Sequence, residues 1–243
     1  MQAGKRHTML KKMPLETHPF FKAHPILSVT PVTAQGYCNL NYKVTTASGV
    51  YLVRQFVNDE VDREKEYLLQ QQAAAAGLAP EVILFDWERG CMVMPFIQGV
   101  HYQELDEKAL GILAGHIKTL HDTLTYDETP LDLKRMIRSE ETAIIEAFEV
   151  IADYPQEQAV CHNDLNPLNL IWQDETLCLL DFEYAGVNDR YFDLAALSVE
   201  FSLSEDTQRH MMQSYFTGNW FRKKQDAYKI LYRQLCKEWF ASY

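Results

Sequence analysis

The sequence predicts an α+β protein of two lobes, in which a five-stranded antiparallel sheet with one helix precedes a mainly helical lobe. Short apolar runs separated by turn residues fill residues 26–57 and 82–95, which is typical of strands. From residue 99 onward apolar residues recur at helical spacing, and a Pro and a Gly near residues 94–99 separate the two patterns. The predicted divisions are an N-terminal tail over 1–25, an N-terminal nucleotide-binding lobe over 26–98 and a C-terminal catalytic lobe over 99–243.

The elements of the first lobe follow from its turns. Residues 26–57 are predicted to form a three-stranded meander, because Gln35-Gly36 and Ser48-Gly49 interrupt runs of apolar and β-branched residues. From Asp59 the spacing becomes helical and ends at Gly77, a C-terminal stop signal. Two further strands, over residues 82–85 and 91–95, complete the predicted sheet of five.

The second lobe is predicted from helical periodicity and from three apolar runs. Leu110, Leu113, Ile117 and Leu120 recur at helical spacing, and similar patterns continue to the end of the sequence. Short strands are expected at 159–161, 168–172 and 177–180. The predicted helices cover residues 106–124, 136–151, 190–201, 205–216 and 221–240.

Composition narrows the classes of function. The 243 residues are 47% hydrophobic and 23% charged, which is ordinary for a globular protein. A formal net charge of −11 argues against a nucleic-acid partner, since phosphate binding depends on clustered Lys and Arg, and it fits a cationic substrate. Five scattered cysteines indicate buried thiols in a reducing compartment, so a cytoplasmic location is expected. No apolar stretch is long enough for a membrane span, and the oligomeric state is not predicted.

The segment from Cys161 to Tyr184 holds the most informative pattern. An apolar run delivers a polar loop with Asp164 and Asn169, and after a hairpin another run ends at Asp181. In kinases such a loop carries an Asp that takes the proton of the acceptor hydroxyl, followed five residues later by an Asn that binds Mg²⁺; an Asp after the next hairpin also binds Mg²⁺. Asn and Asp are common in tight turns, but turn formation explains neither the spacing nor the Phe that follows Asp181. The pattern therefore predicts a phosphotransferase site.

This arrangement resembles the aminoglycoside phosphotransferase and choline kinase superfamily, small-molecule kinases with a two-lobed protein-kinase-like fold. The likeness runs from about Thr30 to Glu200, and the segments 181–184 and 188–193 are most similar to those of bacterial choline/ethanolamine kinases. The resemblance implies ATP and Mg²⁺ as cofactors and transfer to the hydroxyl of a small cationic amino-alcohol, choline or ethanolamine first. Thiamine kinase and aminoglycoside phosphotransferase are alternatives. A non-catalytic relative that binds a nucleotide or a protein is an alternative of another class.

The resemblance also implies roles for individual residues. Asp164 is the expected catalytic residue, Asn169 and Asp181 are the expected magnesium ligands, and Glu183 is a further metal ligand. For the partner of Arg54, Glu60 and Glu64 remain alternatives to Glu66. The residues expected to contact the nucleotide are Gly36, Asn39, Arg54, Glu66, Met94 and Phe96.

For the acceptor, the resemblance implies Asn166, Tyr184 and Glu200, because a cationic ligand needs a carboxylate and aromatic faces. His162 is expected to be a structural hydrogen-bonding residue rather than a base, and Asp193 is expected to hydrogen-bond the backbone of the catalytic loop. Four late aromatic residues are left open between core packing and acceptor binding: Trp220, Phe221, Tyr232 and Trp239.

Overall fold

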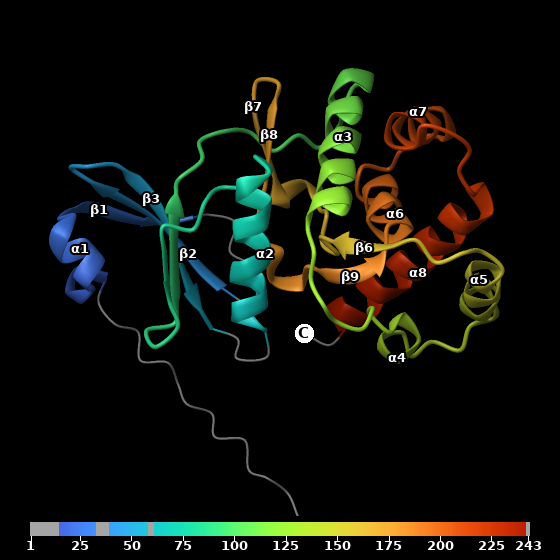
Figure 1. The fold of residues 1–243 in the computed structure, drawn as a ribbon, viewed down its shortest axis with the longest axis horizontal. Coiled ribbons are helices and arrows are strands. Elements are labelled where there is room, and N and C mark those ends of the chain that lie inside the picture. The colour runs from blue at the N-terminus through green and yellow to red at the C-terminus, as the bar shows by residue number, and fades with distance from the viewer. Residues whose placement is uncertain (1–14, 33–38, 58–60, 242–243) are drawn as a thin grey trace, which may run out of the picture. The chain divides into compact units, whose positions relative to one another are not determined.

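The computed structural model describes residues 15–32, 39–57 and 61–241, whose helices and strands are drawn in Figure 1. Backbone contacts divide the chain into two compact units. The first unit contains residues 1–63 and 81–97, and the second contains residues 64–80 and 98–243. Strands form the first unit and helices dominate the second, so the predicted α+β fold class is confirmed.

The first unit is built on one antiparallel sheet with the strand order β1-β2-β3-β5-β4. All five strands were expected from the turn pattern, and the short helix α1 (Pro19–Ala23) precedes them. Val44, Val53 and Val93 are fully buried and pack with Phe21 of α1, forming a small core of their own. The strands are β1 (Ile26–Pro31), β2 (Asn39–Thr46), β3 (Val50–Phe56), β4 (Leu84–Asp86) and β5 (Cys91–Pro95).

Helix α2 (Arg63–Ala75) ends as predicted at Gly77, whose φ of 75° is a left-handed conformation that glycine adopts without strain. Residues 64–80 group with the second unit, and specific bonds explain this. The side chain of Gln72 bonds both backbone groups of Thr125, at 2.9 and 3.0 Å. The Leu179 N–H donates to the Leu78 carbonyl at 2.7 Å. The segment is therefore hydrogen-bonded to the rest of the second unit at two places along its length.

Helices make up most of the second unit. Helix α3 begins after Asp106, whose side chain accepts a hydrogen bond from the Ala109 N–H at 2.8 Å. The helix predicted over 136–151 is wrong in its first turn, because residues 137–141 are not helical and a separate helix starts at Thr142, with Glu141 at its N-cap position. The helices are α3 (Glu107–Thr123), α4 (Leu133–Met136), α5 (Thr142–Ala152), α6 (Tyr191–Glu200), α7 (Glu205–Tyr215) and α8 (Arg222–Ala241).

Two short antiparallel pairs of strands carry the polar loops of the second unit. Strands β7 (Leu170–Gln173) and β8 (Thr176–Leu179) form the predicted hairpin. Strand β6 (Gln158–Cys161) pairs with β9 (Gly186–Asp189), which the sequence pattern did not indicate. Because β9 pairs with β6, it brings the chain that follows the hairpin back beside the loop after β6.

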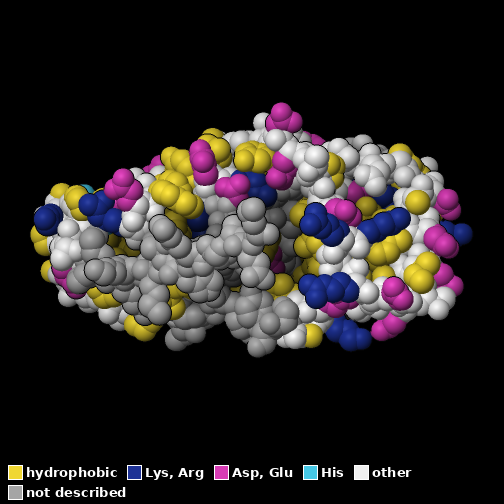
Figure 2. All heavy atoms as spheres, turned by 90° about the horizontal axis from the view of Figure 1, so that it is seen from below, with side chains coloured by type: hydrophobic (Ala, Val, Ile, Leu, Met, Phe, Trp, Pro, Cys, Tyr) yellow, Lys and Arg dark blue, Asp and Glu magenta, His cyan; other side chains and the backbone are white. Residues whose placement is uncertain are grey.

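No helix in the described part of the chain is long and apolar enough to cross a membrane. On the face shown in Figure 2, the coloured Lys and Arg side chains lie interspersed with Asp and Glu rather than in one continuous basic area. This distribution agrees with the acidic composition.

Candidate active site

In the loop between β6 and β7, two of the predicted polar residues bond the carboxylate of a third, Asp164. Asn166 donates its side-chain N–H to Oδ1 of Asp164 at 3.1 Å, and Asn169 donates to Oδ2 at 2.8 Å. A second N–H of Asn169 bonds the Asp164 carbonyl at 2.9 Å. Asp164 is therefore held by an amide on each oxygen, which fixes its rotamer.

The electrostatics of Asp164 suit a group that takes up a proton. Burial raises the pKa of this carboxyl above its ordinary value, and the negative charge of Asp181 adds to the effect, whereas His162 and the two amide bonds oppose it. The interaction with Asp181 also shows that the two carboxylates, seventeen residues apart in sequence, lie within electrostatic reach of each other.

The donor set beside Asp164 fits a hard divalent cation such as Mg²⁺. Both amide hydrogens of Asn169 are directed to Asp164, so its Oδ1 is left as an oxygen ligand. Asp181 follows β8 and adopts φ 67°, and the Leu180 N–H bonds the Asn169 carbonyl at 2.9 Å, which ties the two segments together. Amide and carboxylate oxygens are ligands that Mg²⁺ prefers. Glu183, in the short turn after Asp181, is partly exposed.

A single buried carboxylate braces the start of this loop. Asp193 on α6 is fully buried and accepts the backbone N–H groups of His162 at 2.7 Å and Asn163 at 2.9 Å. The expectation that Asp193 hydrogen-bonds the loop backbone is confirmed. Although burial alone would raise the pKa of Asp193, its hydrogen bond with His121 and its interactions with His121 and His162 hold it below the ordinary value.

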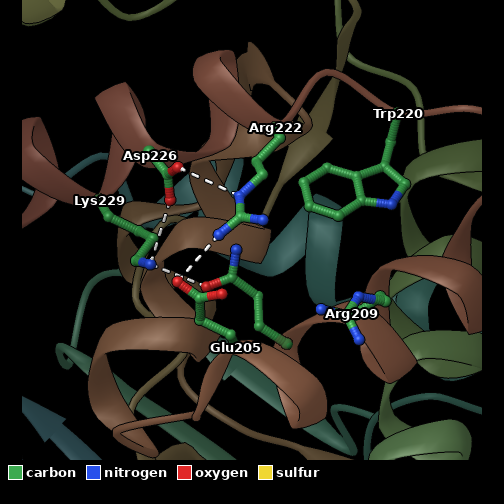
Figure 3. A pocket seen from close by; sticks show the side chains of 7 residues that line it. Glu205, Arg209, Trp220, Arg222, Asp226 and Lys229 are labelled. Carbon is green, nitrogen blue, oxygen red and sulfur yellow. Dashed lines mark hydrogen bonds and ion pairs between the residues drawn. The ribbon is translucent and has the colours of Figure 1, made fainter.

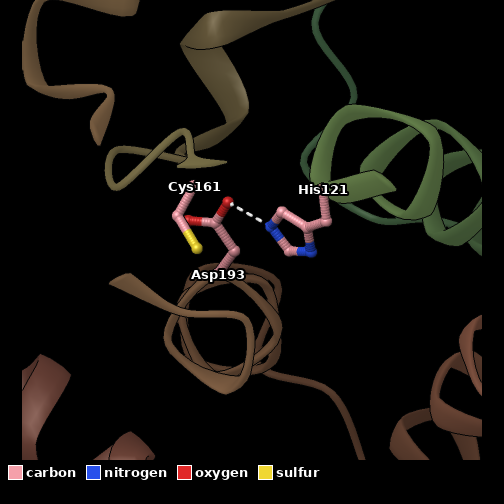
Figure 4. Close-up of side chains that lie close together, drawn as sticks. All are labelled: His121, Cys161 and Asp193. Atoms are coloured by element: carbon pink, nitrogen blue, oxygen red, sulfur yellow. Dashed lines mark hydrogen bonds and ion pairs between the residues drawn. The ribbon is translucent and has the colours of Figure 1, made fainter. Parts of the chain in front are cut away.

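Behind Asp193 lies His121 of α3, which the sequence reading missed. Its Nε2 is 3.0 Å from Asp193 Oδ2, and its Nδ1 is 2.7 Å from the Tyr215 hydroxyl. Cys161 is close to both residues, as Figure 4 shows. Asp193 is already occupied by hydrogen bonds, and burial raises the pKa of the Cys161 thiol well above its usual range, so this cluster braces the loop rather than binding a metal.

Asn163 occupies a backbone conformation that few residues tolerate. Its φ is 65°, in the left-handed region that Asn enters more readily than most residues. The side chain donates to the carbonyls of Tyr184 at 3.0 Å and Gly186 at 3.3 Å, and accepts from Asn188 at 2.9 Å. Asn163 therefore joins the catalytic loop to the segment that leads into β9.

His162 has the structural role that the sequence suggested. Its Nε2 lies 2.8 Å from the Leu180 carbonyl, and its ring packs against Phe182 with 4.9 Å between the centroids. The residue is fully buried. It therefore supports the turn that presents Asp181.

The predicted acceptor residues differ in their surroundings. Glu200 ends α6 and is half-buried, with the Tyr232 hydroxyl of α8 donating to its Oε1 at 2.8 Å. Burial raises the pKa of Glu200, the bond from Tyr232 opposes this, and the charge of Asp164 raises it further. Tyr184 is exposed. The structure thus brings Glu200 within electrostatic reach of Asp164.

Trp220 lies in surroundings that differ from those of Glu200. It lines a small pocket between α7 and α8 with Arg209, Arg222 and Lys229, together with the acids Glu205 and Asp226 (Figure 3). Arg222 pairs with Glu205 at 2.9 Å, so the acidic groups there are already engaged. The acidic side chains of this pocket are therefore paired with its own basic side chains, and the pocket is poorly suited to a cationic ligand.

Four of the predicted nucleotide contacts lie in the first unit. Asn39 begins β2, and Arg54 on β3 is buried, with its Nε 3.4 Å from Asn41 Oδ1. Met94 is buried on β5, and the ring of Phe96 lies under the Lys43 ammonium at 4.5 Å. These roles stay predictions.

The other two expected nucleotide residues lie elsewhere. Glu66 on α2 belongs to the second unit and is fully buried, whereas its alternative Glu64 is exposed. Burial favours Glu66 as the partner of a cation, because a buried carboxylate requires compensation. Gly36 and the alternative Glu60 lie outside the described residues.

Comparisons with known proteins identify the family of this chain. A family model described as the phosphotransferase enzyme family matches residues 29–229. Protein LicA of Haemophilus influenzae is 24% identical over 228 residues, which are 83% of this chain and 66% of that protein. The matched part thus spans just under two thirds of this relative.

Solved structures show the same fold. Choline kinase LicA from Streptococcus pneumoniae superposes with a TM-score of 0.78 at 22% identity, covering 91% of this chain and 86% of that one. A choline/ethanolamine kinase family protein from Mesorhizobium loti gives 0.75 at 23% identity, covering 93% and 82%. A spectinomycin phosphotransferase gives 0.66 at 13% identity, covering 90% and 85%. The predicted protein-kinase-like fold and the predicted family are confirmed: this chain belongs to the phosphotransferase enzyme family.

Proposed function

We propose that this protein transfers the γ-phosphoryl group of ATP, with Mg²⁺, to the hydroxyl of a small cationic amino-alcohol, and that choline and ethanolamine are the first candidates. Asp164 carries the proposal for the chemistry, because its carboxylate is fixed by two amides beside the oxygen ligands of Asn169 and Asp181. The choice of acceptor is supported by the names of two structural neighbours, a choline kinase and a choline/ethanolamine kinase family protein.

The residues near Asp164 have separate roles in phosphoryl transfer. Asp164 orients the acceptor hydroxyl and takes its proton as the oxygen bonds to phosphorus and the bond to ADP breaks. Asn169 and Asp181, with Glu183 as a further ligand, would hold Mg²⁺, which supplies charge neutralisation at the phosphates. No phosphorylated side chain is required.

The nucleotide side of the proposal follows the roles expected from the sequence. Arg54 binds the phosphates, the backbone around Met94 and Phe96 binds adenine, and Glu66 supplies a buried carboxylate. Asn39, at the start of β2, contributes to phosphate binding.

The preference for a cationic acceptor rests on Glu200. This half-buried carboxylate has a negative neighbour, Asp164, and among the described residues no Lys, Arg or His pairs with it. Two carboxylates close together in a partly buried site repel each other, and a bound ammonium group relieves that repulsion. The acceptor itself would then supply the missing positive charge.

The test is a coupled assay of ADP release with Mg-ATP and a panel of choline, ethanolamine, thiamine and aminoglycosides. 3,3-Dimethylbutan-1-ol, the uncharged carbon analogue of choline, is the matched control for charge. We expect turnover of an amino-alcohol, little turnover of the uncharged analogue, and a loss of about 10³-fold in kcat for Asp164→Ala. Asp153→Ala, an exposed acid after α5, should keep full activity.

The outcomes separate the alternatives. Turnover of thiamine or an aminoglycoside alone would keep the phosphotransfer chemistry and discard the amino-alcohol. A folded sample that binds no nucleotide and releases no ADP with any acceptor would refute the proposed activity and favour a binding protein.

A further inference from the structure

One hydrogen bond links the last long helix to the predicted acceptor carboxylate. The Tyr232 hydroxyl on α8 donates to Oε1 of Glu200 at 2.8 Å. The Tyr232 residue is only 4% exposed, and its ring packs edge-on against Phe192, with 5.6 Å between the centroids. Because the ring is confined on α8, its hydroxyl has a fixed direction toward Glu200.

The two oxygens of the Glu200 carboxylate differ in their hydrogen bonding. Among the described residues, no donor reaches its second oxygen, Oε2. The Tyr232 hydroxyl bonds Glu200, and the Asp164 carboxylate and the Cys236 thiol interact with it electrostatically; none of these three groups carries a positive charge. One oxygen is therefore fixed, and the other has no protein donor in the described part of the chain.

A neutral donor has a different effect from a basic one at this position. A Lys or Arg in place of Tyr232 would neutralise Glu200 and compete with a cationic ligand. A hydroxyl stabilises the ionised carboxylate through a hydrogen bond and leaves its net charge unchanged. It therefore keeps Glu200 charged in a half-buried place where burial and Asp164 both favour the neutral acid.

We propose that Tyr232 is a positioning residue for the acceptor: its hydroxyl holds one oxygen of Glu200 so that the other receives the ammonium group. This inference rests on the proposed function, and it adds α8 to the elements that determine specificity. Tyr232 acts through Glu200 and does not itself touch the reacting atoms.

The chain offers a close control for a packing role. Tyr228 lies one turn earlier on α8, is 3% exposed, and packs edge-on against the same Phe192 ring with 6.5 Å between the centroids. Its hydroxyl interacts with Asp189 rather than with Glu200. Tyr228→Phe and Tyr232→Phe therefore remove the same buried group from the same helix, and only the second removes the donor to Glu200.

The experiment compares steady-state kinetics of the wild type, Tyr232→Phe and Tyr228→Phe with the preferred cationic acceptor and with its uncharged carbon analogue. Tyr232→Phe should raise the KM of the cationic acceptor about five- to tenfold, the loss of one hydrogen bond to a charged group. Its kcat and its KM for ATP should change less than about twofold. Tyr228→Phe should leave all of these constants unchanged.

A double variant locates the effect. In a Glu200→Gln background, Tyr232→Phe should raise the KM of the cationic acceptor by less than about twofold, since the carboxylate on which it acts is gone. A full five- to tenfold rise in this background would overturn the inference, because Tyr232 would then act independently of Glu200.

The remaining outcomes distinguish this inference from the proposed function. If the wild type phosphorylates no cationic acceptor, the proposed function fails and the inference fails with it. If the wild type is active and Tyr232→Phe leaves the KM of the cationic acceptor unchanged, only the inference fails. An equal rise in KM for the uncharged analogue, or in Tyr228→Phe, would assign Tyr232 a packing role and overturn the inference as well.

Discussion

The loop that carries Asp164 and the carboxylate of Glu200 lie in the same unit, but they are held in very different ways. The loop carrying Asp164 is fixed by the buried Asp193, by three side-chain bonds of Asn163 and by the amides of Asn166 and Asn169. Glu200 is held by one hydroxyl, although it is within electrostatic reach of Asp164. The residues proposed for the reaction are thus fixed by several contacts, whereas the carboxylate proposed for recognition of the acceptor has one hydrogen bond among the described residues.

The largest effect should come from removing the brace of the loop. Asp193→Ala leaves the N–H groups of His162 and Asn163 and the ring of His121 without their acceptor, so the free energy of unfolding should fall by about 3–5 kcal/mol. Urea denaturation measures the change. Asp122→Ala, which breaks surface pairs with Lys118 and Arg190, should cost less than about 1 kcal/mol. Equal losses in the two variants would contradict the role of the buried brace.

The next effect separates backbone strain from side-chain bonding at Asn163. Asn163→Ala loses the side-chain bonds and places a Cβ-bearing residue with little preference for φ 65° in that conformation, so we expect a cost of about 2–3 kcal/mol. Asn163→Gly loses the same bonds without the conformational cost and should be about 1 kcal/mol more stable than the Ala variant. Denaturation curves of both variants test this. Identical stabilities would show that strain contributes nothing.

On the recognition side, Glu200→Gln should leave the fold intact and weaken the binding of a cationic acceptor. We expect the KM of that acceptor to rise about 10- to 100-fold with kcat nearly unchanged, because the variant loses a charge that acts equally in the ground and transition states. Glu205→Gln, an exposed acid on α7, is the control. A fall in kcat with unchanged KM would place Glu200 in the reaction itself and remove the contrast between the two regions.

The smallest expected effect is on the pH dependence of folding stability, which Asp193 and Glu200 influence in opposite directions. Asp193 has a lowered pKa, so its stabilisation is present above pH 3.8 and is lost as the pH falls through its pKa in the folded state. Glu200 has a raised pKa, so the folded state gains stability as the pH falls toward 4.5 and loses it as the pH rises. The melting temperature of Glu200→Gln, relative to that of the wild type, should therefore rise between pH 4.5 and 7. A difference that stays constant would contradict the raised pKa.

Local patterns explain what the sequence could predict. The order of Asp164, Asn169 and Asp181 is set by short runs and one hairpin, so spacing alone was enough to place them in one motif. Strand β9 was not recognised, because its Gly, Asn and Asp are typical of turns and it forms only through pairing with β6.

Contacts between distant segments were beyond the reach of these patterns. His121 lies 72 residues before Asp193, and Tyr232 lies 32 residues after Glu200. The sequence did contain one signal for His121, an ionisable residue beside Leu120 and Leu124 on the apolar face of a helix. Nothing local distinguished Tyr232 from the other aromatic residues of α8.

The hydrogen bonds between residues 64–80 and the rest of the second unit limit how this polypeptide can be divided into fragments. The chain passes between the two units after residues 63, 80 and 97, so neither unit is a continuous stretch of sequence. A fragment that begins at residue 98 would leave the backbone groups of Thr125 without Gln72 and the Leu179 N–H without the Leu78 carbonyl. Cutting the gene at the boundary between strands and helices would therefore yield an incomplete second half, which a separately added peptide of residues 64–80 should help to restore.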